Sequence, residues 1–317
     1  ALLLFTILAL NDAWQRRWVC DDAFISFRYA EHLASGLGLV YNPGEYVEGY
    51  TNFLWTVFLA MGSWLNVDLP FLSIILSLSA YFLLLLGAAS KYKQIDWLTL
   101  IGCVAILHVR IFATSGLETA LFLAAEIWFC RALLSRASAA VFVLGILLPL
   151  VRPEGGVFWI TSLFFIPKSR AALSFCLLSA YGIWKLYYFG DLLPNTFYAK
   201  AADSQWEQGF LYLRLFFGMY WILIPMLLSP LVMLVKGDRA ERAISLCCLV
   251  LGCHLLRVGG DFMFARFALP LCPLILVLTS EWMSRSAVRL SIQRALIALV
   301  ALALLAGGCA SQALSVD

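Results

Sequence analysis

Two adjacent carboxylates, Asp21 and Asp22, open residues 20–52, the longest run of this chain that is too polar to lie in lipid. A carboxylate can take the proton from an acceptor hydroxyl while a new bond forms, so both are candidate catalytic residues. The simpler alternative is that one of them caps the helix that follows. Capping requires a single Asp and leaves the second one unexplained, so both interpretations stay open.

Cationic side chains near the ends of the apolar segments complement these acids. Arg and Lys stabilise the charge that develops on a phosphate leaving group, and Arg can do so through two parallel hydrogen bonds. Acids and cations together favour transfer of a group that is carried on a lipid phosphate. The candidates for binding that phosphate are Arg266, Arg152, Lys200 and Arg28.

Other polar and aromatic side chains at the same positions are candidates for contacting a sugar or an acceptor. Ionisable groups at bilayer depth usually line a cavity, because each costs at least about 2.5 kcal/mol at the bilayer centre. Each charge could instead be a solvated loop residue, and each Tyr could belong to an interfacial aromatic belt. The candidates are Glu118, Glu154, Asp261, Glu48, Tyr50, Tyr198 and His32.

The composition defines the class of protein. The chain is 63% hydrophobic and 13% charged, and its mean hydropathy of +0.90 excludes an ordinary soluble domain. We expect one all-α, polytopic membrane domain over residues 1–317, without a soluble domain after the last apolar segment. The net charge of +3 gives no reason to expect a nucleic-acid partner.

The positions of the basic residues predict the topology. Short basic clusters belong to the cytoplasm by the positive-inside rule, and the mixed-charge segments between them belong to the outer face. The basic clusters are Lys91/Lys93, Arg131/Arg136, Lys168/Arg170, Lys236/Arg239/Arg242 and Arg285/Arg289/Arg294. The outer segments are 11–52, 108–118, 152–154, 190–208 and 257–266.

Eleven crossings follow from this alternation, although a span normally needs about 20 residues and several of these are shorter. They lie near 1–10, 70–90, 97–110, 117–134, 139–150, 156–166, 171–188, 209–235, 243–256, 267–283 and 295–308. Residues 53–66 are apolar but do not fit the alternation, so we expect a second helix half-sunk in the outer leaflet and capped by Thr51 or Asn52.

Local patterns predict how three of the outer segments are built. Apolar residues at helical spacing predict an interfacial helix from Ala23 to Ala34, which Gly36 ends. Pro149 and Pro153 break the backbone around Arg152, and broken backbone at membrane depth is tolerated where it lines a cavity. The loop 259–266 begins with two glycines and contains Asp261 and Arg266, which either contact a ligand or form a weak local ion pair.

Five segments together resemble membrane glycosyltransferases of the GT-C superfamily, in particular the mycobacterial terminal arabinofuranosyltransferase group and its bacterial relatives. The ordered set covers positions 21 to 266 and is fairly specific for the group, although not for the sugar. The segments are 20–52, Ser115-Gly116-Leu117-Glu118-Thr119, Arg152-Pro153-Glu154-Gly155, the run 191–200 (DLLPNTFYAK), and Gly259-Gly260-Asp261-Phe262-Met263 with Arg266.

The resemblance implies a GT-C helix bundle with juxtamembrane helices in its first outer loop. It implies transfer of a sugar, arabinofuranose among the options, from a polyprenyl-monophosphate donor to a glycan or lipid-linked acceptor, with inversion. The partners would be this donor, this acceptor and membrane lipids, at the periplasmic face of a bacterial plasma membrane. Asp21, the first acid of the pair, would be the base, and Asn52 and Asn195 join the sugar-contacting candidates.

Two other functions remain alternatives, and a divalent cation remains an alternative to a site without a cofactor. A polytopic transporter or flippase would also hold polar groups in its pathway, and a non-catalytic relative would only bind a glycan lipid. Transporters often consist of two related halves, which this sequence does not show. We expect no cofactor and no metal site, although adjacent carboxylates such as Asp21 and Asp22 could hold a divalent cation.

Overall fold

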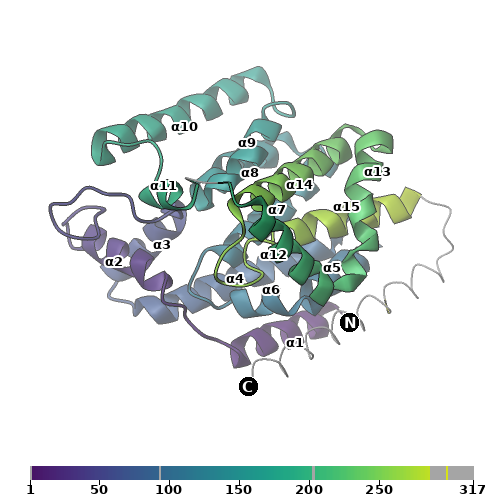
Figure 1. Ribbon diagram of the computed structural model, residues 1–317, viewed down its shortest axis with the longest axis horizontal. Coiled ribbons are helices and arrows are strands. Elements are labelled where there is room, and N and C mark those ends of the chain that lie inside the picture. Colours follow the sequence, from purple (N-terminus) through teal and green to yellow (C-terminus); the bar gives the residue numbers. More distant parts are fainter. Residues whose placement is uncertain (1, 93, 202–203, 286–297, 299–317) are drawn as a thin grey trace.

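The computed structural model describes residues 2–92, 94–201, 204–285 and 298, and it shows an almost wholly helical protein (Figure 1). One two-stranded antiparallel hairpin, β1 (Ser90–Lys91) with β2 (Gln94–Ile95), is present in this part of the chain. The all-α prediction is therefore confirmed. Several predicted features lie outside the described residues: Lys93, Arg289, Arg294, the segment 295–308 apart from residue 298, and the side chain of Lys200.

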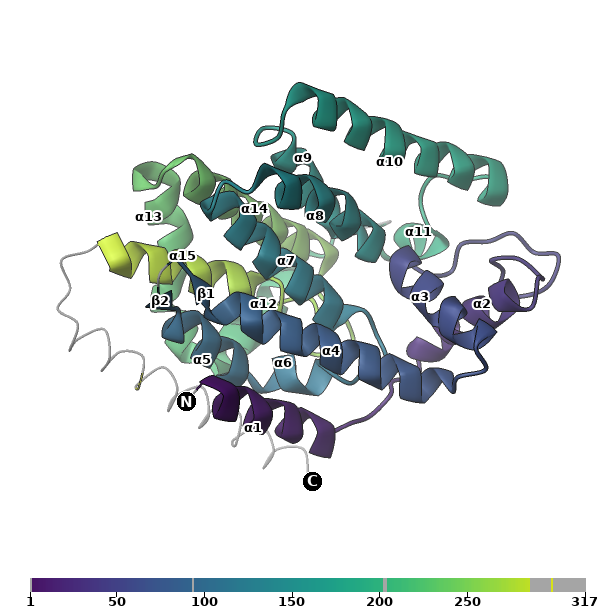
Figure 2. The ribbon, with the colours of Figure 1, turned by 180° about the vertical axis from the view of Figure 1, so that it is seen from behind.

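The helices form a bundle around a core made by α4, α7, α14 and α15, with α2 and α3 packed together at one side and α10 along one edge (Figures 1 and 2). The first helices are α1 (Leu2–Gln15), α2 (Ala23–Ala34), α3 (Phe53–Trp64), α4 (Leu69–Ala89), α5 (Trp97–Ala105), α6 (Leu107–Phe112) and α7 (Thr119–Leu134). They are followed by α8 (Ser138–Val151), the 3-10 turn η1 (Pro153–Gly155), α9 (Gly156–Ser162), α10 (Lys168–Phe189) and α11 (Asn195–Ala201). The last are α12 (Trp206–Met219), η2 (Trp221–Leu223), η3 (Pro225–Leu227), α13 (Leu228–Lys236), α14 (Arg239–Val258) and α15 (Leu271–Arg285).

The first outer loop folds as the sequence predicts, with two short helices. α2 spans the predicted residues, and Gly36 follows it with a φ of +78° that favours glycine. The capping interpretation is wrong for Asp22, because this residue precedes α2 but its side chain makes no capping hydrogen bond. The apolar segment 53–66 forms α3, and Asn52 precedes it with its side chain engaged elsewhere.

The predicted basic clusters lie together at one end of the bundle. Lys91 Nζ pairs with Glu281 at 3.2 Å, and Glu281 lies one turn of α15 before Arg285. Arg285 in turn reaches Asp238 at 3.2 Å. Further bonds connect Arg239 to the carbonyl of Phe164, and Arg170 to the hydroxyl of Ser138. Arg131 Nη1 lies 3.9 Å from the same Glu281, so the described members of all five clusters lie at this end of the bundle.

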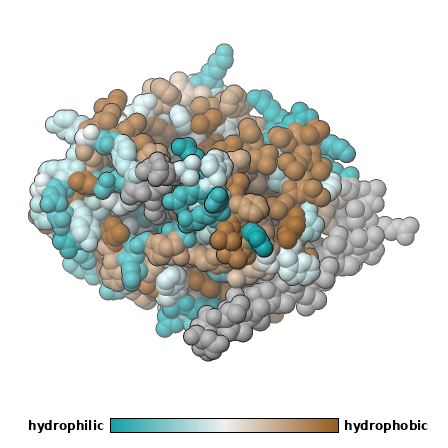
Figure 3. Space-filling view, in the orientation of Figure 1, coloured by the Kyte–Doolittle hydropathy of each residue, from teal (hydrophilic) through white to brown (hydrophobic). Residues whose placement is uncertain are grey.

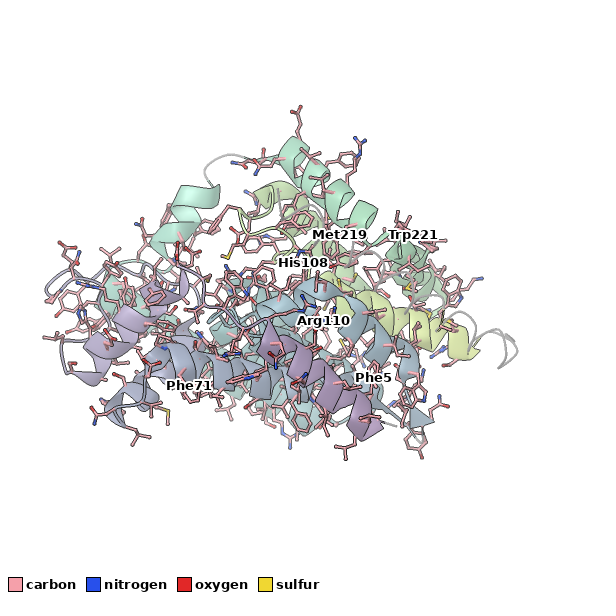
Figure 4. All side chains as sticks on the ribbon, turned by 90° about the horizontal axis from the view of Figure 1, so that it is seen from below. Phe5, Phe71, His108, Arg110, Met219 and Trp221 are labelled. Atoms are coloured by element: carbon pink, nitrogen blue, oxygen red, sulfur yellow. The ribbon has the colours of Figure 1, made fainter. Side chains whose placement is uncertain are left out.

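The predicted outer segments lie at the opposite end. Their connections include Arg110 with Asp12, Asn52 with Glu118, Glu118 with Arg152 and Arg266, the backbone of Asn195 with Glu48, and the backbone of Gln205 with Arg257. Figure 4 shows Arg110 above α1, where its Nε lies 2.9 Å from Asp12 Oδ2. The sequence-based division into two sets of loops therefore matches the two ends of the bundle.

The predicted loops divide clearly between the two ends of the bundle, but the expected number of eleven crossings is not confirmed. Among the described residues, α4 is the one helix long and apolar enough to cross a bilayer by itself. Residues 206–219 and 221–236 meet the same test only together, and they are bent by 100°. The expected span 97–110 is interrupted at Ile106, and the expected span 1–10 continues to Gln15. The other expected spans within the described residues are helices that are shorter or less apolar.

Hydrophobic surface covers much of the region of α13 and α14, whereas hydrophilic surface gathers over α2 and the adjoining loop (Figure 3). Many large apolar side chains are exposed, for example Leu173 and Ile183 of α10 and Leu228 and Val235 of α13. Monomeric soluble proteins rarely expose large contiguous apolar patches, so this surface suits contact with lipid.

The arrangement of the two loop sets predicts an accessibility pattern that labelling can measure. Single cysteines at Asn42 and Ser204 should react with a membrane-impermeant thiol reagent in intact cells, and a cysteine at the exposed Lys236 should react only after permeabilisation. The background protein needs replacements of Cys176 and Cys253, whose side chains are exposed, and of Cys309, which lies outside the described residues. Labelling of Lys236→Cys in intact cells would contradict the topology.

Candidate functional site

Glu118 lies at the centre of a buried ion network that joins four segments far apart in the sequence. Its Oε1 accepts a hydrogen bond from Arg266 Nη2 at 2.9 Å and lies 3.7 Å from Arg152 Nε. Its Oε2 accepts a hydrogen bond from Asn52 Nδ2 at 2.8 Å. One carboxylate thus fixes two guanidinium groups and one amide at the end of the bundle where the predicted outer segments lie.

Two further carboxylates complete the network. Arg152 Nη2 pairs with Glu154 at 2.6 Å, and Arg266 Nη1 lies 3.4 Å from Asp261. The local Asp261–Arg266 ion pair, which is the simpler interpretation of this loop, is present. The shorter contact of Arg266 is nevertheless with Glu118. Arg266 is therefore a buried member of a network rather than half of an exposed pair.

The electrostatics of the network favour ionised Glu118. Burial alone would raise the pKa of its carboxyl, but Arg266, Arg152 and the Asn52 amide together hold that pKa below its ordinary value. Arg266 in turn has a raised pKa, because Glu118 and Asp261 outweigh the effect of burial. Desolvated charges of this kind persist only where partners satisfy them, so each member depends on the others.

The segment before α7 holds the carboxylate pair next to this network. Cys20 donates its backbone N–H to Ser115 O at 3.0 Å, which places Asp21 and Asp22 beside the 115–118 turn. Gly116 has a φ of +81°, and a Cβ there would lie 2.8 Å from the Cβ of Ala23. Only glycine fits both requirements, so this turn lets the start of α2 approach Glu118 closely.

The two arginines are positioned by breaks in the helices, as the sequence predicts for Arg152. α8 ends at Val151, Arg152 has an extended backbone, and the Pro153–Gly155 turn separates it from α9. Arg266 follows a loop in which Gly259 and Gly260 both have positive φ. The backbone leaves the helical path at such breaks, so a side chain can point into a cavity from a position where a regular helix would point it elsewhere.

A cavity of about 450 Å³ adjoins the network. Seven of the predicted site residues line it: Asp22, Tyr50, Asn52, Glu118, Arg152, Glu154 and Arg266. Four buried polar atoms among the lining residues have no hydrogen-bond partner in the described part of the chain: Arg152 Nη1, Arg266 Nε, Tyr50 Oη and Thr196 Oγ1. Buried polar groups are nearly always hydrogen-bonded, so these atoms indicate a place for a polar ligand.

Other predicted site residues do not line the cavity. Arg28 Nε donates to the carbonyl of Tyr41 at 2.7 Å, and the His32 Nδ1 lies 2.9 Å from the carbonyl of Val40. Both side chains, one turn apart on α2, thus fasten the loop that follows this helix. Asp21 is exposed and does not belong to the lining, whereas its neighbour Asp22 does.

Glu48, Asn195 and Tyr198 instead hold the neighbouring loops together. Glu48 forms a buried ion pair with Lys185 of α10 at 2.6 Å, and its carbonyl accepts the backbone N–H of Asn195. Burial raises the pKa of Glu48, and Lys185 only partly offsets this. Tyr198 donates its hydroxyl to Asp191 at 2.9 Å. These contacts anchor the segment 191–198 above the cavity, which Thr196 and Phe197 line.

Sequence reasoning missed several lining residues. His254 lines the cavity from α14, at four-residue spacing from Val250 and Val258, which line it too. A histidine inside an apolar helix is the signal that could have identified it. Thr196 and Phe197 belong to the run 191–200, in which only Asn195, Tyr198 and Lys200 are predicted site residues. Among the described residues, no group of three or more His, Cys, Asp or Glu side chains could hold a metal ion.

Comparison with known proteins supports the resemblance to the arabinofuranosyltransferase group. The chain is 31% identical over 325 aligned positions to the terminal beta-(1->2)-arabinofuranosyltransferase of Mycobacterium tuberculosis, an alignment that covers 81% of this chain and 51% of that protein. It is 30% identical to the protein of the same name from Corynebacterium glutamicum, over 87% of this chain and 50% of that protein. The chain thus spans about half the length of these curated relatives. No family model and no solved structure matches it.

The network predicts a large loss of stability when Glu118 is neutralised. Glu118→Gln leaves two buried guanidinium groups without their shared counter-charge and should cost about 3 kcal/mol of unfolding free energy. The measurement is thermal unfolding in detergent, with Glu31→Gln on the exposed side of α2 as the control.

The same carboxylate predicts a pH dependence. Because the folded pKa of Glu118 is depressed, its contribution is full above the unfolded value of about 4.3 and declines as the pH falls towards the folded value. Glu118→Gln should therefore flatten the acid side of the stability profile. An unchanged melting temperature together with an unchanged profile would contradict the central role of this residue.

Proposed function

We infer that this chain is the membrane domain of a glycosyltransferase that moves a sugar from a polyprenyl-monophosphate donor to a glycan or lipid-linked acceptor. The observation that carries the proposal is the set of unpartnered polar atoms around the cavity, two of which belong to arginines. The names of the two relatives suggest arabinofuranose as the sugar. The reaction would take place at the outer face of a bacterial plasma membrane, with inversion at the anomeric carbon.

The donor phosphate would bind at Arg152 Nη1 and Arg266 Nε. Glu118, Glu154 and Asp261 already fix the other guanidinium nitrogens, so the free N–H groups are oriented before the ligand arrives. Donors that need no reorganisation stabilise charge that develops in a transition state. As the glycosidic C–O bond breaks, the leaving phosphate gains negative charge, and these N–H groups would stabilise it.

The carboxylate pair would supply the base. One of its members takes the proton of the acceptor hydroxyl while the hydroxyl oxygen attacks the anomeric carbon from the face opposite the phosphate. The resemblance points to Asp21, whereas the cavity is lined by Asp22. Both residues are held beside the network by the Cys20–Ser115 backbone bond.

The sugar and the lipid tail would occupy different parts of the cavity. Tyr50 and Thr196 present their unpartnered hydroxyls to the sugar. The polyprenyl chain would follow the apolar side, where α14 contributes Val250, Leu251 and Val258. An apolar wall with a few fixed polar groups is the usual character of a small-molecule site.

One observation favours the alternative of a transporter. Glu126 lies two turns deeper in α7 than Glu118, it is fully buried, and neither of its carboxyl oxygens has a hydrogen-bond partner among the described residues. Ionisable groups at such depth mark transport pathways in many membrane proteins. Substrate counterflow in liposomes, without formation of a glycosylated product, would establish this alternative and exclude the transferase.

Substitution of the carboxylate pair tests the transferase directly. Asp21→Asn and Asp22→Asn are nearly isosteric but cannot accept a proton, so the variant that lacks the base should lose at least about 100-fold in transfer rate. The other variant should lose less, through poorer positioning of the acceptor. The assay follows transfer from a polyprenyl-phosphate sugar by the protein in detergent, with donor binding measured separately.

The control for this experiment is Glu31→Gln, which removes an exposed carboxylate from the same helix region and should leave transfer unchanged. Retained donor binding in both Asn variants shows that the loss concerns the chemical step. Near-normal transfer in both single variants would rule out the pair as the source of the base.

A further inference from the structure

A second cavity, of about 470 Å³, lies at the end of the bundle opposite the candidate active site. The same helices connect the two cavities: Glu118, which directly precedes α7, lines one, and Leu133, near the end of α7, lines the other. α14, with 20 residues, contributes Ala240 to this cavity and Val258 to the first. A helix of this length rises about 30 Å, close to the thickness of a bilayer core.

Basic residues from three connections between helices, or from the first turn of the helix that follows, meet at this second cavity. Arg136 and Arg239 line it, and Arg170 adjoins it through its bond to Ser138, which is a lining residue. Arg239 is held by an uncharged partner, the carbonyl of Phe164, and its guanidinium lies 5.0 Å from the ring centre of Phe165. The positive charges of Arg170 and Arg239 are therefore positioned by the protein but not neutralised by these contacts.

The acidic group of the cavity is already engaged. Asp238 accepts the backbone N–H groups of Ala240 and Glu241 as the cap of α14, and it also pairs with Arg285. The guanidinium of Arg136 makes no hydrogen bond or ion pair with any described residue. The cavity thus presents uncompensated positive charge to whatever enters it.

Arg136 occupies a backbone position that costs stability. Its φ is +58°, and it follows the last turn of α7 at the place where helices commonly end with glycine. A left-handed conformation is unfavourable for a residue with a long side chain, and such strain concentrates at functional sites. An arginine at this position places its charge at the rim of the cavity.

The surroundings of the cavity indicate which anion fits it. Phe164, 65% exposed, lines the cavity, and Leu173 and Phe175 of α10, the helix that begins close to Arg170, are exposed too. We propose that this cavity binds the phosphate headgroup of an anionic phospholipid, whose acyl chains lie along the apolar surface. Basic pockets between helices on the cytoplasmic side of membrane proteins bind such headgroups, and the positive-inside rule assigns these loops to that side. This site goes beyond the proposed transferase and does not depend on it.

Thermal unfolding of the full chain in detergent tests the site. Added phosphatidylglycerol should raise the melting temperature, whereas phosphatidylcholine should not. Arg136→Gly should raise the melting temperature in the absence of lipid, because glycine tolerates the left-handed backbone, and this increase shows that the variant folds. The phosphatidylglycerol concentration for half-maximal stabilisation should increase about fivefold in Arg136→Gly and again in the double variant with Arg239→Gln.

Lys236→Gln is the matched control, because it removes one positive charge from the same loop as Arg239 without belonging to the cavity lining. Its phosphatidylglycerol response should equal that of the unchanged protein. An equal response in the double variant, or equal stabilisation by phosphatidylcholine, would overturn the proposal. Equal stabilisation by inorganic phosphate, lost in the same variants, would assign the cavity to a soluble phosphate and overturn the lipid assignment.

Discussion

The end of the bundle that carries the candidate site depends on the contacts of Glu118, which are ion pairs with Arg152 and Arg266 and a hydrogen bond from Asn52. They connect the loop before α3, the turn before α7, the break after α8 and the loop before α15. Removal of two guanidinium groups from water costs several kcal/mol each unless partners compensate them, and Glu118 is the partner that they share. The network leaves one guanidinium nitrogen of each arginine uncommitted, and both nitrogens belong to residues that line the cavity.

In each arginine, some guanidinium nitrogens hold the side chain in place and another nitrogen is left to bind a ligand. Carboxylates fix the orientation of each guanidinium, and the remaining N–H groups face a ligand without further reorganisation, which is the condition for strong stabilisation of developing charge. Such a site contains several buried charges, which are costly to remove from water. The ends of the helices around the site hold these charges in position. At the other end of the bundle, arginines with neutral partners leave their charge available at a second cavity.

The sequence predicts the local features of the site better than its connections. α2, the break at Arg152 and the glycine turn at 259–260 follow from residue spacing and backbone chemistry. The joint contact of Glu118 with both arginines depends on tertiary packing, which for Arg266 joins residues 148 positions apart and which no local pattern encodes. Arg28 and Glu48 were expected at the site, but the fold-back of the first loop directs them to Tyr41 and Lys185. Helix lengths were also harder to predict, because apolar composition continues through breaks such as Ile106.

A structure of this protein with a bound polyprenyl-phosphate sugar or a non-hydrolysable analogue tests the central claim most directly. The claim predicts phosphate oxygens within hydrogen-bonding distance of Arg152 Nη1 and Arg266 Nε, with the contacts of both arginines to Glu118 retained. It also predicts the anomeric carbon on the side of the phosphate that faces the Asp21–Asp22 pair. A phosphate bound elsewhere in the protein, with these two N–H groups still without a partner, would contradict it.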